Sequence, residues 1–231
     1  MQDLPVKLVI DRASLATADG ATHHGIFDVA FLSHIPNMTI LSPITYGSLS
    51  AAINVANSSK TPIAIRYPNA SESEAVRETF YKDSDYSNFG IKQSFKTTEI
   101  PEYIFVTYGG ITPKVLEAEG LLRERGISVG TVLLERLKPC GDITERIKEY
   151  LSRAKCVLFV EEGIKNGGAG MLIQSKLSEL SAENLENYEI LAIDDNFAIP
   201  DSETELYTYL GMSPECLFEK ILKSPLEKKT D

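Results

Sequence analysis

The chain has 231 residues, 43% of them hydrophobic, which is enough for one large or two modest domains with a packed core and excludes a disordered chain. The formal net charge of −10 has the wrong sign for wrapping nucleic acid or lying on an anionic membrane, so we expect neither partner. No run approaches the roughly 18 apolar residues of a membrane helix, and the start of the chain lacks a secretory signal, so we expect a cytoplasmic protein. Three widely spaced cysteines argue against a disulfide framework or a zinc site, and we assign no metal ligand.

Short apolar runs alternate with helix-period segments, a pattern that predicts an α/β fold of βα units on parallel sheets in two regions. In the first region we expect strands at residues 6–10, 38–41 and 63–65, with a helix after Pro43. Polar, turn-rich runs follow, so we predict a first domain at 1–68, a linker at 69–101 and a second domain at 102–231. A sheet of about three strands leaves an edge and an apolar face open, and we expect residues 4–66 to pack on the second domain or on a partner chain.

The second region is more regular. We expect strands at residues 103–107, 129–134, 156–160 and 190–193. One helix has Thr112 as its cap and Pro113 in its first turn. The next carries a buried face, and two helices close the chain. That face consists of Ile143, Ile147, Tyr150, Leu151 and Ala154.

The densest polar loop, at residues 11–25, directly follows the first predicted strand, where ligands bind in parallel α/β sheets. It holds Arg12, Asp19, His23 and His24. An imidazole can pass a proton near physiological pH, and an arginine can hold an anion through forked hydrogen bonds. By residue type alone, a turn capped by Asp19 with merely exposed histidines is an equal alternative.

Two further features have plainer interpretations. Residues 167–170 read GGAG before a helix and could cradle a phosphate, but they lack a P-loop lysine and dinucleotide spacing, so we favour close helix packing. Glu161 and Glu162 could form a paired acid, but we expect them to end a strand facing solvent.

Motifs along nearly the whole chain resemble the 1-deoxy-D-xylulose-5-phosphate synthase family of the transketolase superfamily. In the first region these are IDRA (10–13), ADGATHHGIFD (18–28), IPNM (35–38) and IRYP (65–68). In the second they are ERLKP (135–139), VEEG (160–163), GGAG (167–170) and IPD (199–201). The resemblance implies a partial pyrimidine-binding domain followed by a three-layer transketolase C-terminal domain.

The resemblance also implies chemistry. Such enzymes use thiamine diphosphate and Mg²⁺ to join pyruvate, with loss of CO₂, to glyceraldehyde 3-phosphate. His23 matches a histidine that donates a hydrogen bond or proton to the acceptor carbonyl oxygen, and Asp19 matches an acid that contacts the substrate. Arg12 and Arg66 match a pair that grips the substrate phosphate. We assign no cofactor-binding residue.

The departures from the family matter as well. The family's catalytic glutamate and its Gly-Asp-Gly diphosphate and metal motif lie upstream of the segment that starts here, and His24 stands where a glutamine is common. We therefore expect a chain that is inactive without the N-terminal part and that works as a homodimer or with an N-terminal partner subunit. The alternatives are the C-terminal subunit of a split transketolase and a non-catalytic dimerisation or regulatory module.

Overall fold

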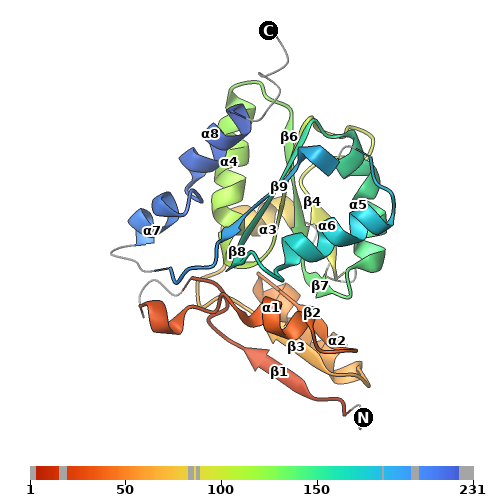
Figure 1. The fold of residues 1–231 in the computed structure, drawn as a ribbon. Coiled ribbons are helices and arrows are strands. Elements are labelled where there is room, and N and C mark those ends of the chain that lie inside the picture. Colours follow the sequence, from red (N-terminus) through yellow and green to blue (C-terminus); the bar gives the residue numbers. More distant parts are fainter. Residues whose placement is uncertain are drawn as a thin grey trace.

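The computed structural model describes residues 4–15, 20–82, 86, 89–183, 185–198 and 203–223, and it contains two β-sheets with helices packed on them (Figure 1). The smaller sheet has the strand order β1-β3-β2-β7, and the larger sheet has the order β4-β6-β5-β8-β9. Strands β4 and β7, each at a sheet edge, run antiparallel to their neighbours, and the other pairs are parallel. The predicted α/β fold class is confirmed.

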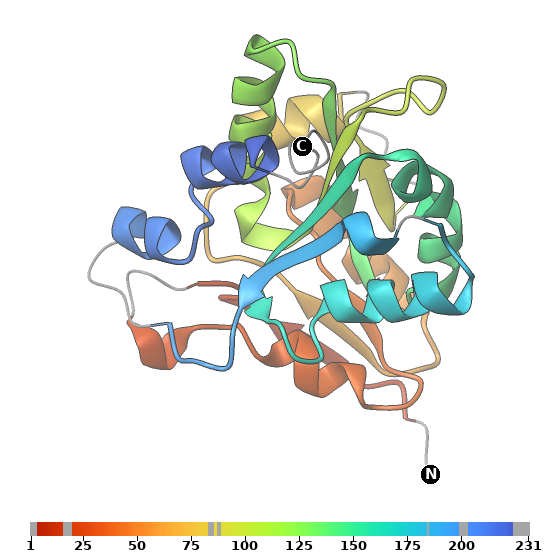
Figure 2. The same cartoon turned by 45° about the horizontal axis from the view of Figure 1, so that its top comes forward.

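The larger sheet is the middle of three layers (Figures 1 and 2). Its strands, in chain order, are β4 (Ile91–Gln93), β5 (Tyr103–Thr107), β6 (Val129–Leu134), β8 (Cys156–Ile164) and β9 (Tyr188–Ile193). Helices α4 (Thr112–Glu124) and α8 (Pro214–Leu222) cover one face, and α5 (Gly141–Arg153) and α6 (Ala169–Glu179) cover the other. Helix α7 (Glu203–Tyr209) precedes α8.

Strand β5 shows why the strands of this region could be predicted from the sequence. Ile104 and Val106 pack toward α5 and α6, while Phe105 packs toward α4 and α8. Because both faces are buried, the strand reads as one continuous apolar run. The predicted bounds of β5 and β6 match the structure residue for residue.

Helix α5 buries the face that its sequence predicts, whereas the predicted start of α4 needs a correction. Ile143, Ile147 and Leu151 of α5 are buried, as their spacing predicts. The prediction that Thr112 caps α4 was wrong by one residue, because Ile111 is the N-cap and Thr112 is already helical. The Thr112 hydroxyl donates to the Gly109 carbonyl 2.7 Å away, which closes the 3₁₀ turn η2 (Gly109–Ile111) before the helix.

The smaller sheet contains the three predicted parallel strands, and two helices lie beside them. These elements are β1 (Lys7–Ile10), α1 (Asp28–Ser33), β2 (Thr39–Leu41), α2 (Tyr46–Ser58) and β3 (Ile63–Arg66). Helix α2 begins with a capping box between Thr45 and Ser48, and it packs Ala52 and Ala56 against β2 and β3. The fourth strand, β7 (Arg136–Lys138), comes from the second region and pairs with β2.

Residues 69–101, predicted as a linker, carry helix α3 (Glu74–Phe80) and strand β4. Helix α3 buries Val76 and Phe80 with Leu133 of the larger sheet, and β4 pairs with β6. This stretch is therefore folded onto the second region.

The two sheets share one hydrophobic core. Leu32 and Ile40 of the first region belong to the same buried cluster as Tyr108, Leu137 and Phe159 of the second. The prediction that residues 4–66 pack on the second region is confirmed. Across the described residues, none of the helices has the length and apolar character needed to cross a bilayer.

Candidate functional site

The carboxyl ends of the parallel strands of both sheets meet at the junction between the sheets. Ser42 follows β2, Arg66 ends β3 and Tyr108 follows β5. The Arg66 guanidinium carbon lies 5.1 Å from the centre of the Tyr108 ring, and Arg66 Nη1 donates to Ser42 Oγ at 3.3 Å. Ligands of parallel α/β sheets bind at this edge, which makes the junction the candidate site.

Arg66 lies beneath the site rather than at its surface, with 1% of the residue exposed. Its Nε donates to Asp28 Oδ2 at 2.8 Å, and its Nη2 donates to the Gly25 carbonyl at 3.5 Å. Burial alone would lower the pKa of this guanidinium, but the Asp28 carboxylate and the Tyr108 ring outweigh burial and raise it. Arg66 is therefore a buried charged group that protein atoms engage through each of its three guanidinium nitrogens.

The loop after β1 returns to its own start at Gly25. Ala13 N donates to the Tyr67 carbonyl at 3.0 Å, and Ser14 and Gly25 exchange backbone hydrogen bonds of 3.1 and 2.9 Å. A Cβ atom at position 25 would lie 2.4 Å from the Arg12 carbonyl oxygen, so this approach requires glycine. The loop segments that carry Arg12 and His23 are thereby held side by side.

Backbone strain is concentrated at the start of this loop. Arg12 has a φ of 54° and Ser14 a φ of 117°, values that L-residues seldom adopt. Such strain persists only where surrounding contacts hold it, and it occurs often at functional sites. The half-buried Arg12 is thus held in a defined backbone conformation at the mouth of the sheet.

The histidines differ in exposure. His23 is exposed at the end of the 3₁₀ turn η1 (Ala21–His23), with its Nδ1 3.1 Å from Thr22 Oγ1. His24 is half-buried, and burial lowers its pKa while a hydrogen bond with the Ala198 backbone acts in the opposite direction. Asp19, the predicted substrate-contacting acid, lies outside the described residues. Arg12 and His23 thus lie on the loop after β1, and Arg66 at the end of β3 contacts that loop through the Gly25 carbonyl.

Glu161 fills the N-terminus of α6. Its carboxylate accepts hydrogen bonds from Ala169 N and Gly170 N, both at 3.0 Å, and from the Tyr108 hydroxyl at 2.7 Å. A Cβ atom at Gly168 would lie 2.7 Å from Glu161 Oε1. The favoured packing interpretation of residues 167–170 is confirmed, because an internal carboxylate stands where a phosphate would bind.

The expectation that Glu161 and Glu162 face solvent was wrong, since their exposed fractions are 0% and 3%. The Tyr207 hydroxyl donates to Glu162 Oε1, and burial raises the pKa of both carboxyls. Together with Asp28, the two glutamates place three buried carboxyl groups near Arg66.

Sequence reasoning missed Asp28, Tyr108 and both glutamates as members of this network. A signal existed for the glutamates: an apolar buried strand turns acidic at its carboxyl end, the edge where ligand sites occur. Nothing local marks Asp28 as the partner of an arginine 38 residues away.

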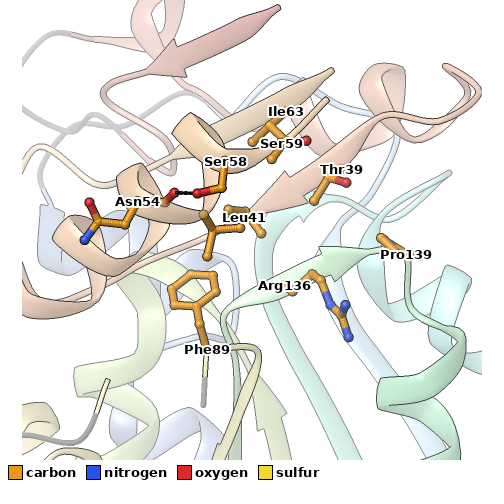
Figure 3. Close-up of a pocket in the computed structure, with 10 residues that line it drawn as sticks. Thr39, Leu41, Asn54, Ser58, Ser59, Ile63, Phe89, Arg136 and Pro139 are labelled. Carbon is orange, nitrogen blue, oxygen red and sulfur yellow. Dashed lines mark hydrogen bonds between the residues drawn. The ribbon is translucent and has the colours of Figure 1, made fainter. Parts of the chain in front are cut away.

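A separate groove of about 650 Å³ lies between α2 and β7 (Figure 3). Leu41, Ile63 and Phe89 supply apolar side chains, and Arg136 lies at the β7 side. No described residue of the loop at 11–25 lines this groove, so it is distinct from the candidate site.

Within the described ranges, no group of three or more His, Cys, Asp or Glu side chains is arranged to hold a metal ion. The helix N-terminus at residues 167–170 is already occupied by Glu161. The junction offers two groups suited to binding a polar acceptor: the half-buried Arg12 guanidinium and the exposed His23 imidazole.

Two family profiles match the chain: "Transketolase, pyrimidine binding domain" at residues 1–72 and "Transketolase, C-terminal domain" at residues 96–217. Similar curated proteins include the 1-deoxy-D-xylulose-5-phosphate synthase of Clostridium tetani, 29% identical over 224 residues, and that of Halothermothrix orenii, 30% identical over 223 residues. Each alignment covers 96% of this chain and 34% of the relative. The chain therefore spans about a third of the length of these relatives.

Solved structures agree on the fold. One described as "Split gene transketolase, inactive beta4 tetramer" has a TM-score of 0.74 at 23% identity, covering 95% of this chain and 66% of that one. Transketolase from Campylobacter jejuni has a TM-score of 0.68 at 17% identity, covering 94% of this chain and 31% of that one. Because the C-terminal-domain profile covers more than half of the residues and follows the pyrimidine-binding profile in order, the chain belongs to the transketolase family, where it resembles the C-terminal part of 1-deoxy-D-xylulose-5-phosphate synthases.

Proposed function

We propose that this chain provides the C-terminal part of a 1-deoxy-D-xylulose-5-phosphate synthase, which condenses pyruvate with glyceraldehyde 3-phosphate and releases CO₂. The observation that carries the proposal is the loop that follows β1: its sequence bears family motifs, and its described ends are joined by the Ser14 and Gly25 hydrogen bonds beside the carboxyl end of β3. Relatives of this name align with 96% of the chain, which supports the same reading.

The chain's own residues would act on the acceptor. The exposed His23 imidazole donates a hydrogen bond or proton to the aldehyde oxygen as that oxygen becomes an alkoxide. Arg12 holds the phosphate through charge-assisted hydrogen bonds, and Asp19 contacts the acceptor's polar groups. Arg66 is the second predicted phosphate ligand, and its contacts with Asp28 and Gly25 also suit it to positioning the loop.

Thiamine diphosphate, when bound, supplies the decarboxylation chemistry and the carbon nucleophile. We assign the binding of the diphosphate and Mg²⁺ to the N-terminal part of the enzyme, where the family resemblance puts the Gly-Asp-Gly motif; among the described residues, no group of three or more His, Cys, Asp or Glu side chains is arranged to hold a metal ion. That part is supplied within a homodimer or by a separate partner subunit.

A chimera tests the function. The 231-residue chain replaces the corresponding C-terminal third of the C. tetani synthase, and deoxyxylulose phosphate formation is measured with thiamine diphosphate, Mg²⁺, pyruvate and glyceraldehyde 3-phosphate. We expect product from the chimera and none from the 231-residue chain alone. An inactive, folded chimera contradicts the function, and product from the chain alone contradicts the need for the N-terminal part. Replacing pyruvate by a ketose phosphate donor separates a synthase from a transketolase.

Variants of the same chimera distinguish two roles for the arginines, phosphate ligand and positioning residue. His23→Ala in this chimera tests the non-catalytic alternative. Loss of a phosphate ligand raises the KM for glyceraldehyde 3-phosphate but leaves the KM for unphosphorylated glyceraldehyde unchanged. We expect this result for Arg12→Ala. Loss of a positioning residue lowers turnover with both acceptors. Arg66→Lys, which keeps the charge and loses the fork, distinguishes the two roles for Arg66.

A further inference from the structure

Glu162 on β8 has no part in the chemistry proposed above, yet it is buried at the junction, with 3% of the residue exposed. Its neighbour Glu161 caps α6 on one face of the larger sheet. Because successive strand residues point to opposite faces, Glu162 extends toward the other face, where Tyr207 of α7 and Lys114 of α4 act on it. Glu162 therefore has partners that differ from those of Glu161.

One carboxyl oxygen of Glu162 bonds to α7. Oε1 accepts a hydrogen bond from the hydroxyl of Tyr207, which is itself buried. The Tyr207 ring also contacts the Lys114 ammonium of α4, whose Nζ lies 4.3 Å from the ring centre. The position of Glu162 is therefore fixed from the second region.

The other carboxyl oxygen faces the loop after β1. A Cβ atom at Gly110 would lie 2.8 Å from Glu162 Oε2 and 2.9 Å from Ser14 Oγ, so both oxygens lie against the same glycine. Oε2 makes no hydrogen bond of ordinary geometry with the described residues, and a buried acceptor without a donor is costly. The Ser14 hydroxyl is a donor beside it and acts to lower the pKa of Glu162. The carboxyl thus favours a Ser14 side chain that stays in place.

The two hydroxyls act on one buried carboxyl. Burial raises the pKa of Glu162, whereas the Tyr207 and Ser14 hydroxyls, Arg66 and Lys114 act in the opposite direction. Loss of either hydroxyl leaves the carboxyl less well solvated by the protein. Tyr207 and Ser14, on different regions of the chain, are therefore coupled through Glu162.

Ser14 has a strained backbone. Its φ is 117°, and Arg12, two residues earlier, has a φ of 54°. Ser14 is buried, and its N–H and carbonyl exchange hydrogen bonds with Gly25. Such conformations persist only where surrounding contacts hold them. The Glu162 carboxyl supplies a contact from the larger sheet at the residue where the strain is greatest.

We propose that Glu162 is a positioning residue, which joins α7 to Ser14 and thereby holds the Arg12 backbone in the conformation that presents its guanidinium to the acceptor phosphate. This inference rests on the proposed function, in which Arg12 is a phosphate ligand. Glu162 acts through Ser14 rather than on the acceptor, since its carboxyl is buried against Gly110.

Variants of the C. tetani chimera test this role through the two acceptors. Glu162→Ala should raise the KM for glyceraldehyde 3-phosphate at least about tenfold, the scale of a misplaced charge-assisted hydrogen bond, and leave the KM for unphosphorylated glyceraldehyde unchanged. Glu162→Gln should keep both KM values near those of the wild type. Its amide retains an acceptor for Tyr207 and has a donor for Ser14 Oγ.

Glu119→Ala is the matched control. Glu119 is also 3% exposed and accepts hydrogen bonds from Ser94 and Thr131, which belong to the β4 and β6 side of the larger sheet. Its loss removes a buried carboxyl away from the loop, so both KM values should stay unchanged.

Tyr207→Phe covers the case in which Glu162→Ala fails to fold. It removes only the hydroxyl that bonds to Glu162 Oε1. The KM for glyceraldehyde 3-phosphate should rise about threefold, the scale of one neutral hydrogen bond, with the KM for glyceraldehyde unchanged.

Amide exchange in the free 231-residue chain tests the same role without turnover. The Ser14 and Gly25 amides make the hydrogen bonds that close the loop. Glu162→Ala should speed their exchange with solvent at least about tenfold relative to the amides of β5, because the loop opens more readily. Glu119→Ala should leave this ratio unchanged.

Each outcome decides the inference separately from the function. The positioning role is overturned if Glu162→Ala and Tyr207→Phe leave the KM for glyceraldehyde 3-phosphate unchanged or raise it equally for both acceptors, or if Glu119→Ala has the same effect. An active chimera in which only Arg12→Ala acts on the phosphorylated acceptor still supports the function. An inactive chimera contradicts the function, and the exchange of the Ser14 and Gly25 amides then decides whether Glu162 holds the loop.

Discussion

At the scale of single residues, the junction depends on one buried guanidinium. Arg66 contacts Asp28, Ser42, Gly25 and the Tyr108 ring, so it joins groups that follow or end three different strands. A buried charge is tolerated when its partners satisfy it and costly when one partner is removed. Arg66 is thus a structural requirement of the loop whatever its contact with substrate.

Arg66→Met should therefore destabilise the protein strongly. We expect a loss of about 3–5 kcal/mol in the free energy of unfolding, because Asp28 would remain buried without its ion-pair partner. Urea denaturation measures the change. Arg153→Met is the control: Arg153 pairs with Glu149 on the surface of α5, and its removal should cost less than about 1 kcal/mol. Equal losses for the two variants would contradict the assigned role.

The buried Glu119 on α4 predicts a pH dependence of stability. Thr131 and Ser94 donate to its carboxylate, and Arg123 Nη2 lies 2.5 Å away, yet burial raises the pKa above its ordinary value of 4.5. The folded state then holds the proton more tightly than the unfolded state. This contribution to stability is fully present below the unfolded pKa and is lost as the pH rises through the folded pKa.

Glu119→Gln should accordingly flatten the decline of stability with rising pH above about 4.5, because glutamine does not ionise. Urea denaturation of wild type and variant between pH 4 and 8 measures the slope. Glu149→Gln, at an exposed carboxylate, serves as the control. Parallel wild-type and Glu119→Gln curves would show that this carboxyl has the same proton affinity in both states.

At the scale of elements, α6 begins on a carboxylate supplied by β8. Glu161 satisfies two backbone N–H groups of the helix and the Tyr108 hydroxyl. Glu161→Ala should cost about 2–4 kcal/mol, combining the loss of a helix cap with a buried hydroxyl left without an acceptor. Thermal or urea unfolding measures it.

The control for this element is an ordinary cap. Ser213 Oγ accepts from Cys216 N at the start of α8, and Ser213→Ala should cost about 1 kcal/mol. If Glu161→Ala cost no more than Ser213→Ala, Glu161 would be a simple cap without a role in the junction.

At the scale of the whole molecule, the shared core predicts one cooperative unit. Leu137 lies on β7, which completes the smaller sheet, and its 1%-exposed side chain belongs to the core cluster of both sheets. Leu137→Ala should lower stability by about 2–5 kcal/mol and leave a single transition, followed by tyrosine fluorescence and far-ultraviolet circular dichroism. Leu222→Ala, at a 37%-exposed position, should have a small effect. Two separated transitions in the wild type would mean that the sheets unfold independently.

Much of the fold was predictable because the signals were local. The β5 and β6 runs are apolar throughout since both faces are buried, and the α5 spacing places its apolar residues on one side. The loop at residues 11–25 could be proposed as the candidate site from the sequence, because it follows a predicted strand and carries family motifs.

By itself, the sequence determined the fold class, the family resemblance and the loop that carries the candidate residues, since each depends on the order of neighbouring residues. Only the tertiary structure decided that β7 completes the smaller sheet, that Arg66 pairs with Asp28 and that Glu161 caps α6. Each of these depends on partners far apart in the chain. From sequence alone, a charged residue is expected to be exposed, because the partner that stabilises it in the interior comes near it only in the folded protein.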